Sequence, residues 1–146
     1  MTETIRISVT PIPLPSQLLG LYNAVGWTIY TRDESALEKA CRNSTYVVCA
    51  WNGETLVGLA RCLSDDVSIA YLQDILVHPD SQRRGIGRRL MDECLERFAH
   101  VRAKVLLTDN EAHQHAFYKS IGYKNTRELK EVPLNALVQM KGLNFE

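Results

Sequence analysis

Apolar and polar residues alternate along this chain with two different periods, and each period predicts its own kind of element. A period of two over residues 5–10 predicts a half-buried strand. Two apolar runs, residues 46–51 and 56–62, are separated by Asn52 and Gly53, a dipeptide that favours a tight hairpin turn. These two runs are therefore predicted to be adjacent antiparallel strands.

A third apolar run, residues 71–77, is the strand around which the rest of the chain is predicted to be organised. Pro79 ends it, because proline cannot donate to a sheet ladder. After a loop that contains Gly85 and Gly87, apolar residues recur at helical spacing over residues 86–98, which indicates a surface helix packed on a sheet. The free N–H groups and the positive dipole end of that helix point back at the loop, where they favour an anion such as a phosphate or pyrophosphate.

The remaining elements follow from the same patterns. The strand predicted after this helix, at residues 101–108, is expected to run parallel to residues 71–77, because a helix crosses between them. In chain order, the other predicted elements are a helix at 18–25, an irregular connection at 28–31, a helix at 33–42 capped by Asp33, a helix at 111–121 closed by Gly122, and strands at 123–126 and 136–141.

The composition is that of a globular protein, since 45% of the 146 residues are apolar and 23% are charged. A chain of this length predicts a single domain over residues 1–146. The 17 basic and 17 acidic residues balance, so charge gives no sign of a nucleic-acid partner. No apolar run approaches the roughly 20 residues of a membrane span, and no signal peptide is recognised, so a cytoplasmic protein is the expectation.

The cysteines do not form a metal site or a redox motif in the sequence, because none belongs to a C-x-x-C pair. Three of them, Cys49, Cys62 and Cys94, sit within apolar patterns. They are read as small buried hydrophobic side chains in a reducing compartment.

The glycine loop has the spacing Gln82-x-x-Gly85-x-Gly87. It lacks the third glycine of the dinucleotide fingerprint and the Gly-Lys-Ser/Thr of the P-loop, which disfavours a nucleotide-binding protein. With the strand end Val77-His78-Pro79 before it, the loop resembles that of the GNAT family, the Gcn5-related N-acetyltransferases. A second local resemblance, at residues 116–123, has an aromatic residue, then Tyr118, two polar residues, an aliphatic residue, Gly122 and an aromatic residue.

The resemblance extends along nearly the whole chain, because the order of predicted elements also follows the GNAT layout. It implies a mixed α/β fold with a mostly antiparallel sheet of about seven strands, a central parallel pair and about four flanking helices. It further implies acetyl-CoA as the acetyl donor and a small-molecule or peptide amine as the acceptor. Because the last strands of such folds often take part in dimers, a homodimer is included among the expected partners.

The resemblance also implies where acetyl-CoA binds. The amides of residues 84–89 would hold the pyrophosphate, with Gln82 alongside, and the arginine side chains would either reach phosphate oxygens or form a solvated helix start. In the family the organising strand is bulged and separates from its parallel neighbour, so that the pantetheine arm pairs with strand backbone. The expected contacts are Ile75, Leu76, Val77, Gln82, Arg83, Arg84, Gly85, Ile86, Gly87, Arg88, Arg89 and Tyr118, together with Asn110.

Asn110 departs from the family pattern. Family members commonly place an asparagine seven residues before the catalytic tyrosine, whereas Asn110 stands eight before Tyr118 and Glu111 stands at seven. Either the helix start is shifted by one residue or the asparagine contact is altered.

Two catalytic residues are predicted. Tyr118 carries the family's general acid, which would protonate the departing CoA thiolate. Asp74 is the first candidate for the base that accepts the proton of the amine, because it is an acid in an otherwise apolar strand just before the thioester position. The alternative for Asp74 is a structural partner for a nearby arginine. His113 and His115 are weaker candidates for the base.

The acceptor pocket is expected to be lined by Trp27 and Tyr30, since aromatic walls suit an aryl amine or a cation. Tyr22 is better interpreted as a core residue. The predicted function is therefore a direct-transfer N-acetyltransferase without a metal. The alternatives are a transferase that uses another acyl-CoA and a GNAT-fold sensor that binds acyl-CoA without turnover.

Overall fold

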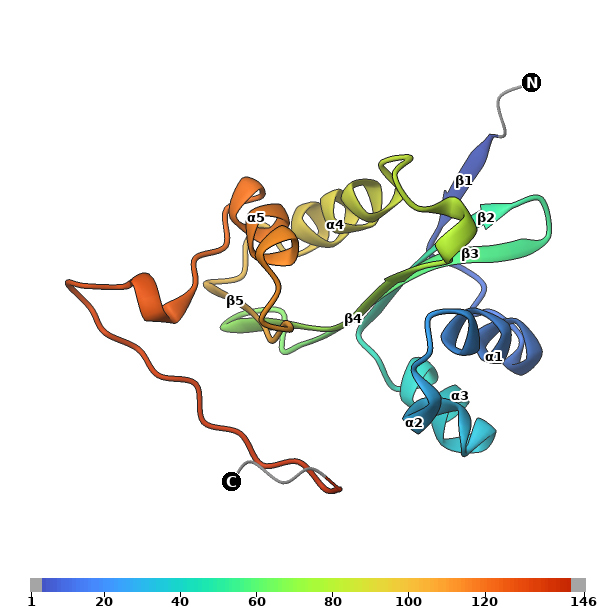
Figure 1. Cartoon of the computed structure of the whole chain (residues 1–146), viewed down its shortest axis with the longest axis horizontal. Coiled ribbons are helices and arrows are strands. Elements are labelled where there is room, and N and C mark those ends of the chain that lie inside the picture. Colours follow the sequence, from blue (N-terminus) through green and yellow to red (C-terminus); the bar gives the residue numbers. More distant parts are fainter. Residues whose placement is uncertain (1–3, 143–146) are drawn as a thin grey trace. The chain divides into compact units, whose positions relative to one another are not determined.

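A computed structural model describes residues 4–142 of the chain (Figure 1). The chain divides into two compact units, residues 1–107 and 108–146. The first unit contains the sheet and most of the helices. The second contains one α-helix and the C-terminal segment.

The first unit is built on a five-stranded mixed sheet in which the strands follow their order along the chain. The pairs from β1 to β4 are antiparallel, while β4 and β5 are parallel. The hairpin at Asn52-Gly53 and the parallel pair are thus confirmed. The strands are β1 (Ile5–Ser8), β2 (Tyr46–Asn52), β3 (Thr55–Ser64), β4 (Ile69–Val77) and β5 (Ala103–Leu106).

Helices cover both faces of this sheet (Figure 1). One face carries α1 (Pro15–Ala24), α2 (Thr28–Thr31) and α3 (Glu34–Arg42), and the other carries α4 (Ile86–Arg97). Asp33 caps α3 as predicted, since its carboxylate accepts a hydrogen bond from the Ala36 amide at 3.1 Å. The irregular connection predicted at residues 28–31 is instead a single helical turn.

The apolar stripes of the helices form the core. Leu18, Leu21 and Tyr22 of α1 are buried against Leu59 of β3 and Leu76 of β4 in one cluster. On the opposite face, α4 buries Ile86, Leu90, Met91 and Cys94, which recur at helical spacing. The apolar periodicity in the sequence therefore also indicates which side of α4 packs on the sheet.

Gly58 sets how closely α4 approaches the sheet. A Cβ atom built at this position would lie 3.2 Å from each of three atoms: Ala50 Cβ, Ile86 Cγ2 and Leu90 Cδ1. Contacts of this length force the neighbours to shift, and here the neighbours are core side chains. A side chain at this crossing of β3 and α4 would therefore fit only if these core side chains moved by a few tenths of an ångström.

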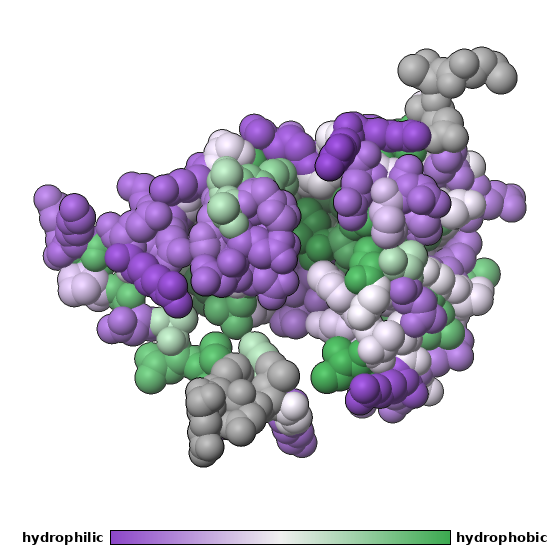
Figure 2. Space-filling model, viewed as in Figure 1, coloured by the Kyte–Doolittle hydropathy of each residue, from purple (hydrophilic) through white to green (hydrophobic). Residues whose placement is uncertain are grey.

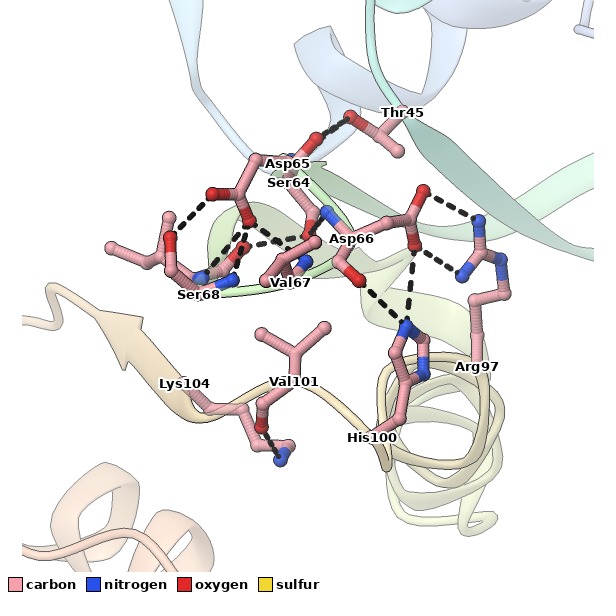
Figure 3. A network of polar contacts seen from close by, with 11 residues as sticks. Thr45, Ser64, Asp65, Asp66, Val67, Ser68, Arg97, His100, Val101 and Lys104 are labelled. Atoms are coloured by element: carbon pink, nitrogen blue, oxygen red, sulfur yellow. Dashed lines mark hydrogen bonds and ion pairs between the residues drawn. The ribbon is translucent and has the colours of Figure 1, made fainter.

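Hydrogen bonds connect the turn between β3 and β4 to the C-terminal end of α4 (Figure 3). Arg97 donates two hydrogen bonds to the Asp66 carboxylate, at 2.6 and 3.2 Å, and a ring nitrogen of His100 lies 2.9 Å from the Asp66 carbonyl oxygen. The Asp65 carboxylate accepts hydrogen bonds from the Ser68 hydroxyl and from three backbone amides, which hold its pKa well below its usual range. These contacts define where β4 begins.

The second unit contains α5 (Ala112–Ser120) and a short 3-10 helix, η2 (Thr126–Glu128). Gly122 follows α5 at the predicted C′ position with a positive φ of 101°. The strands predicted at residues 123–126 and 136–141 are wrong within the described part of the chain, so the sheet has five strands rather than seven. The large apolar residues of the second stretch, Leu137, Val138 and Met140, are instead exposed, as are Val132 and Leu134 before it, and hydrophobic residues are visible on this part of the surface (Figure 2).

Within residues 4–142, none of the helices has the length and apolar character needed to cross a membrane.

We expect Gly58→Ala to destabilise the protein by about 1–3 kcal/mol, because the added methyl group overpacks the contact between β3 and α4. Chemical denaturation of the purified variant measures this difference. The matched control is Gly20→Ala in α1, where the added Cβ meets nothing within 4 Å. Helix propensity there favours alanine by up to about 1 kcal/mol. Equal stability of the two variants would contradict the packing argument.

Candidate active site

A β-bulge divides β4 into two halves that face different helices. Opposite β3, Arg61 pairs with Asp74 while Cys62 pairs with Leu72, so Gln73 is the extra residue. Without the bulge, Leu72, Asp74 and Leu76 would share one face. Instead Leu72 lies opposite Cys62, which interacts with Cys94 of α4, whereas Leu76 belongs to the core cluster under α1 and α3. The bulge therefore turns Asp74 toward α1–α3.

The pairing of β4 with β5 ends at the same place. Ile69 to Leu72 pair with Ala103 to Leu106, and in the described residues no β5 partner continues beyond Leu72. The rest of β4, up to Val77, is held on its β3 side, where Gly58 lies opposite Val77. One edge of this half-strand, which includes Ile75 and Leu76, is therefore released from the parallel neighbour. This matches the bulged and separated strand implied by the family resemblance.

The Asp74 carboxylate is buried, with 3% of the residue exposed, and it accepts four hydrogen bonds. Arg61 donates Nε and Nη2 to Oδ2 at 3.0 and 2.8 Å. The Tyr22 hydroxyl donates to Oδ2 at 2.9 Å and the Tyr30 hydroxyl to Oδ1 at 2.8 Å. The arginine partner considered as the alternative for Asp74 is therefore present.

Arg61 and Gln73 were not assigned a role from the sequence. Arg61 is a lone charged residue in an apolar strand, and only the register of the hairpin places it opposite Asp74. Gln73 is the bulge residue, and its side-chain amide donates to the Tyr30 hydroxyl at 3.1 Å. A lone charge in each of two neighbouring strands was the available signal.

Three aromatic rings from α1, α2 and their connection pack together above this carboxylate. Tyr22 lies edge-on to Tyr30 with ring centroids 5.2 Å apart, and Trp27 is 6.0 and 6.2 Å from the two tyrosines. Tyr22 is fully buried, as expected for a core residue. Trp27 and Tyr30 are half-buried, so these two predicted acceptor-pocket residues are brought together.

The loop after β4 has the backbone of an anion site. Gly85 is the N-cap of α4 with a φ of 75°, and Arg83 also takes a positive φ, 65°, which is costly for a residue with a side chain. The Arg89 amide is the first that bonds back into the helix, to the Gly85 carbonyl. The N–H groups of Ile86, Gly87 and Arg88 are thus the orphan donors at the helix N-terminus.

Open space lies over this loop. A Cβ atom built at Gly85 meets nothing within 4 Å, and one at Gly87 meets only Val77 Cγ2 at 4.0 Å. Neither glycine is therefore required by packing within the chain. Their lack of side chains leaves the orphan amides accessible to a phosphate group, which is what a pyrophosphate cradle requires.

Several polar side chains of the loop are bonded within the chain. Gln82 donates to the Val77 carbonyl at 3.2 Å, which ties the loop to the end of β4. Arg88 pairs with Asp92 at 3.2 Å, and Arg89 donates to the Ile5 carbonyl at 3.2 Å. The anion site thus depends on backbone amides more than on these side chains.

The second unit carries the remaining predicted residues. Tyr118 is half-buried on α5, and burial together with the charge of Asp109 raises the pKa of its phenol. Asn110 is exposed just before α5, which begins at Ala112. His113 pairs with Glu111 at 3.2 Å, and His115 lies 3.2 Å from the Asp109 carbonyl oxygen.

Cys49, Cys62 and Cys94 are buried and free, as expected, and so is Cys41. Burial raises the pKa of Cys41 to about 11 and that of Cys49 to about 12, so both thiols stay protonated at neutral pH. Within residues 4–142, no group of three His, Cys, Asp or Glu side chains is arranged to hold a metal ion. An open hollow in the second unit, beside Lys119, Tyr123 and Glu128, contains none of the predicted site residues.

Several of the known proteins that this chain resembles are acetyltransferases. A model of the acetyltransferase (GNAT) family matches residues 15–123. The solved structure of a GNAT-family acetyltransferase from Streptococcus pneumoniae is 30% identical with a TM-score of 0.78, and the match covers 96% of this chain and 100% of that one. A candidate acetyltransferase of Gibberella zeae is 28% identical over 134 residues, which are 88% of this chain and 73% of that protein.

Other matches are partial or more distant. An uncharacterized N-acetyltransferase of Prochlorococcus marinus is 35% identical over 83 residues, so the match spans 54% of this chain and 45% of that protein. An aminoglycoside acetyltransferase from an uncultured soil metagenomic sample, solved with sisomicin, shares the fold at 22% identity and a TM-score of 0.63. That match covers 92% of this chain and 97% of the other.

We expect Arg61→Ala to lower the free energy of unfolding by about 3–5 kcal/mol, because it leaves the buried Asp74 charge without its cation. The matched control is Arg88→Ala, which breaks an exposed pair with Asp92 in α4 and costs at most about 0.5 kcal/mol. Urea denaturation of both variants measures the difference. A loss in Arg61→Ala no larger than that of the control would show that the pair does not hold the fold.

Proposed function

Since the chain belongs to the acetyltransferase (GNAT) family, we propose that it moves an acetyl group from acetyl-CoA to the primary amine of an acceptor by direct transfer in a ternary complex. The observation that carries the proposal is that three structural features follow one another along β4. The strand bulges at Gln73, leaves β5 after Leu72, and ends in a glycine loop at the N-terminus of α4.

The loop residues would bind the phosphates of acetyl-CoA. The orphan amides of Ile86, Gly87 and Arg88 point out of the helix end, and the helix dipole adds to their attraction for an anion. Gly85 and Gly87 leave room for the pyrophosphate to reach them. Arg83 and Arg84 are exposed beside this point, where their charge attracts phosphate oxygens.

The released edge of β4 would hold the pantetheine arm. Ile75, Leu76 and Val77 follow the bulge. The His78 amide donates to the Val57 carbonyl, so in this register Leu76 bonds toward β3, whereas Ile75 and Val77 direct their N–H groups to the released edge. An extended ligand would pair with the strand there. The amide of a neighbour of Leu76, Ile75 or Val77, would then donate to the thioester oxygen as negative charge develops on it. A preorganised donor of this kind contributes a few kcal/mol to transition-state stabilisation.

Tyr118 would supply the proton for the departing thiolate. Its raised pKa keeps the phenol protonated at neutral pH, which suits a proton donor. This role is carried over from the family motif around Tyr118, and Asn110 stays a predicted pantetheine contact on the same basis. All four cysteines are buried, so none offers an accessible thiol for an acetyl-enzyme, which supports direct transfer.

The acceptor amine would bind beside Trp27 and Tyr30, close to the bulge. An ordinary primary amine, with a pKa near 10.4, must lose a proton before it attacks the thioester. Asp74 was the first candidate for the base, yet its carboxylate already accepts hydrogen bonds from Arg61, Tyr22 and Tyr30. Water or a group on the acceptor side would therefore take the proton from the amine.

Three further expectations remain predictions: one domain over residues 1–146, a cytoplasmic location and a homodimer. The family match over residues 15–123 includes residues of both units, which supports the first of them.

We expect isothermal titration calorimetry to give a Kd for acetyl-CoA of about tens of micromolar or tighter. Gly87→Ala should weaken binding at least about tenfold, because its methyl group occupies the approach to the amides. The fold should tolerate the variant, since only Val77 Cγ2 lies within 4.0 Å of the added atom. Gly20→Ala in α1 is the binding control. Unchanged affinity in Gly87→Ala would remove the loop from the site, and no binding by the wild type would remove the function.

We expect Tyr118→Phe to lower kcat by about 10²–10⁴-fold with little change in the KM for acetyl-CoA, because only the proton donor is lost. The assay follows CoA release across a panel of an aryl amine, an aminoglycoside, an amino acid and a lysine peptide. Tyr123→Phe is the matched control, because its ring packs 6.0 Å from that of Tyr118 in the same unit. Wild-type kcat in Tyr118→Phe on every amine that is turned over would refute the acid role.

A further inference from the structure

The Tyr30 hydroxyl has a defined orientation that leaves one acceptor position unused in the chain. Its hydrogen is directed to Asp74 Oδ1 at 2.8 Å, and one lone pair of its oxygen accepts from Gln73 Nε2 at 3.1 Å. A phenolic oxygen has two lone pairs, of which the second is not engaged by either contact. Because Tyr30 is half-buried and not sealed in the core, a ligand can reach this oxygen.

The second phenol on the same carboxylate provides an internal comparison. Tyr22 also donates to Asp74, at 2.9 Å to Oδ2, but it is fully buried. Its hydroxyl therefore has a purely internal role. Both tyrosines donate to Asp74, but they differ in their exposure to solvent, which decides whether a ligand can contact them.

Asp74 is better suited to orient Tyr30 than to take a proton itself. Its charge is balanced by Arg61, which is 5% exposed and bonds it through two nitrogens. The carboxylate oxygens are therefore already occupied by donors, and the Tyr30 hydrogen is held on the Asp74 side. This makes the phenol oxygen a stronger acceptor, since hydrogen bonds in a chain polarise one another.

The position of Tyr30 relates this oxygen to the proposed acetyl-transfer point. Gln73, which donates to it, is the bulge residue where β4 parts from β5. Asp74, which accepts from it, directly precedes the proposed thioester segment at Ile75 and Leu76. Both hydrogen bonds of the hydroxyl therefore connect it to the part of β4 at which an acceptor would meet the thioester.

We infer that the Tyr30 oxygen binds the acceptor amine by accepting a hydrogen bond from one of its N–H groups, and that Asp74 and Arg61 are positioning residues that orient this phenol. This inference rests on the proposed transferase function and adds a specificity-determining contact to it. The class of acceptor is a primary amine that presents an N–H at the bulge. A fully substituted nitrogen has no such donor and is excluded.

The test compares Tyr30→Phe with Tyr22→Phe. Each variant removes one hydroxyl from Asp74 and keeps the ring, so the aromatic packing between the two residues, at a centroid distance of 5.2 Å, is retained. We expect Tyr30→Phe to raise the KM of the acceptor amine about tenfold, the equivalent of one hydrogen bond. Its KM for acetyl-CoA should stay within about twofold of wild type on the same reasoning.

Tyr22→Phe should behave differently. It removes a buried hydrogen bond, so its Tm should fall, while its KM for the amine should match that of wild type. The probe is the amine that the wild type turns over with the highest kcat/KM in the panel given above. Both KM values and the Tm are measured for all proteins under the same conditions.

Each outcome decides one question. An unchanged amine KM in Tyr30→Phe, or an equal rise in both variants, would overturn the inference and leave the transferase function standing. Acetyl-CoA binding without turnover of any amine would overturn the transferase function and the inference together. A selective rise in amine KM for Tyr30→Phe alone supports the assignment.

Discussion

A single buried carboxylate joins the elements on one side of the sheet. Asp74 on β4 accepts hydrogen bonds from Arg61 on β3, Tyr22 on α1 and Tyr30 on α2. A charge in the interior is tolerated only when it is paired and hydrogen-bonded, because desolvation costs several kcal/mol per ion. Consistent with this, no buried side-chain polar atom lacks a partner in the described residues. The positions of α1 and α2 therefore depend on the same group that lies beside the proposed reaction site.

The bulge at Gln73 makes that arrangement possible. A regular strand would have directed Asp74 to the same face as Leu72, toward α4. The extra residue reverses the face for the second half of β4 and coincides with the end of its pairing with β5. One local irregularity thus places a charge under the acceptor-side helices and frees strand backbone for a ligand.

The glycine loop depends on backbone geometry rather than on its positive side chains. Gly85 begins α4 from a left-handed conformation, and the orphan amides face open space. Gln82, Arg88 and Arg89, which would be natural phosphate contacts, form bonds within the chain. The charge of the arginines still adds to the potential at the helix end, but the amides provide the geometry.

The sequence alone determined the elements whose patterns are local. The Asn52-Gly53 hairpin, the Asp33 cap, the stripe of α4 and the Gly122 terminus were all predictable, because each depends on neighbours within a few residues. The glycine spacing also pointed to the family. The turn at Thr28–Thr31 was missed because a single helical turn is too short to show a period. Strands were predicted at residues 123–126 and 136–141 because alternation indicates strand propensity but not a partner to pair with.

Only the tertiary structure showed which side chains Asp74 contacts. The sequence showed an acid in an apolar strand and left a base and an ion-pair partner equally open. The contacts of Asp74 depend on the register that sets Arg61 opposite it, on the bulge that turns it toward α1, and on two phenols 52 and 44 positions away along the chain. The spacing of apolar residues along the chain shows neither the register, nor the bulge, nor the contacts with the phenols. Contacts between distant residues arise only when the sheet and helices pack, so the chemistry of this carboxylate could not be read before the fold was known.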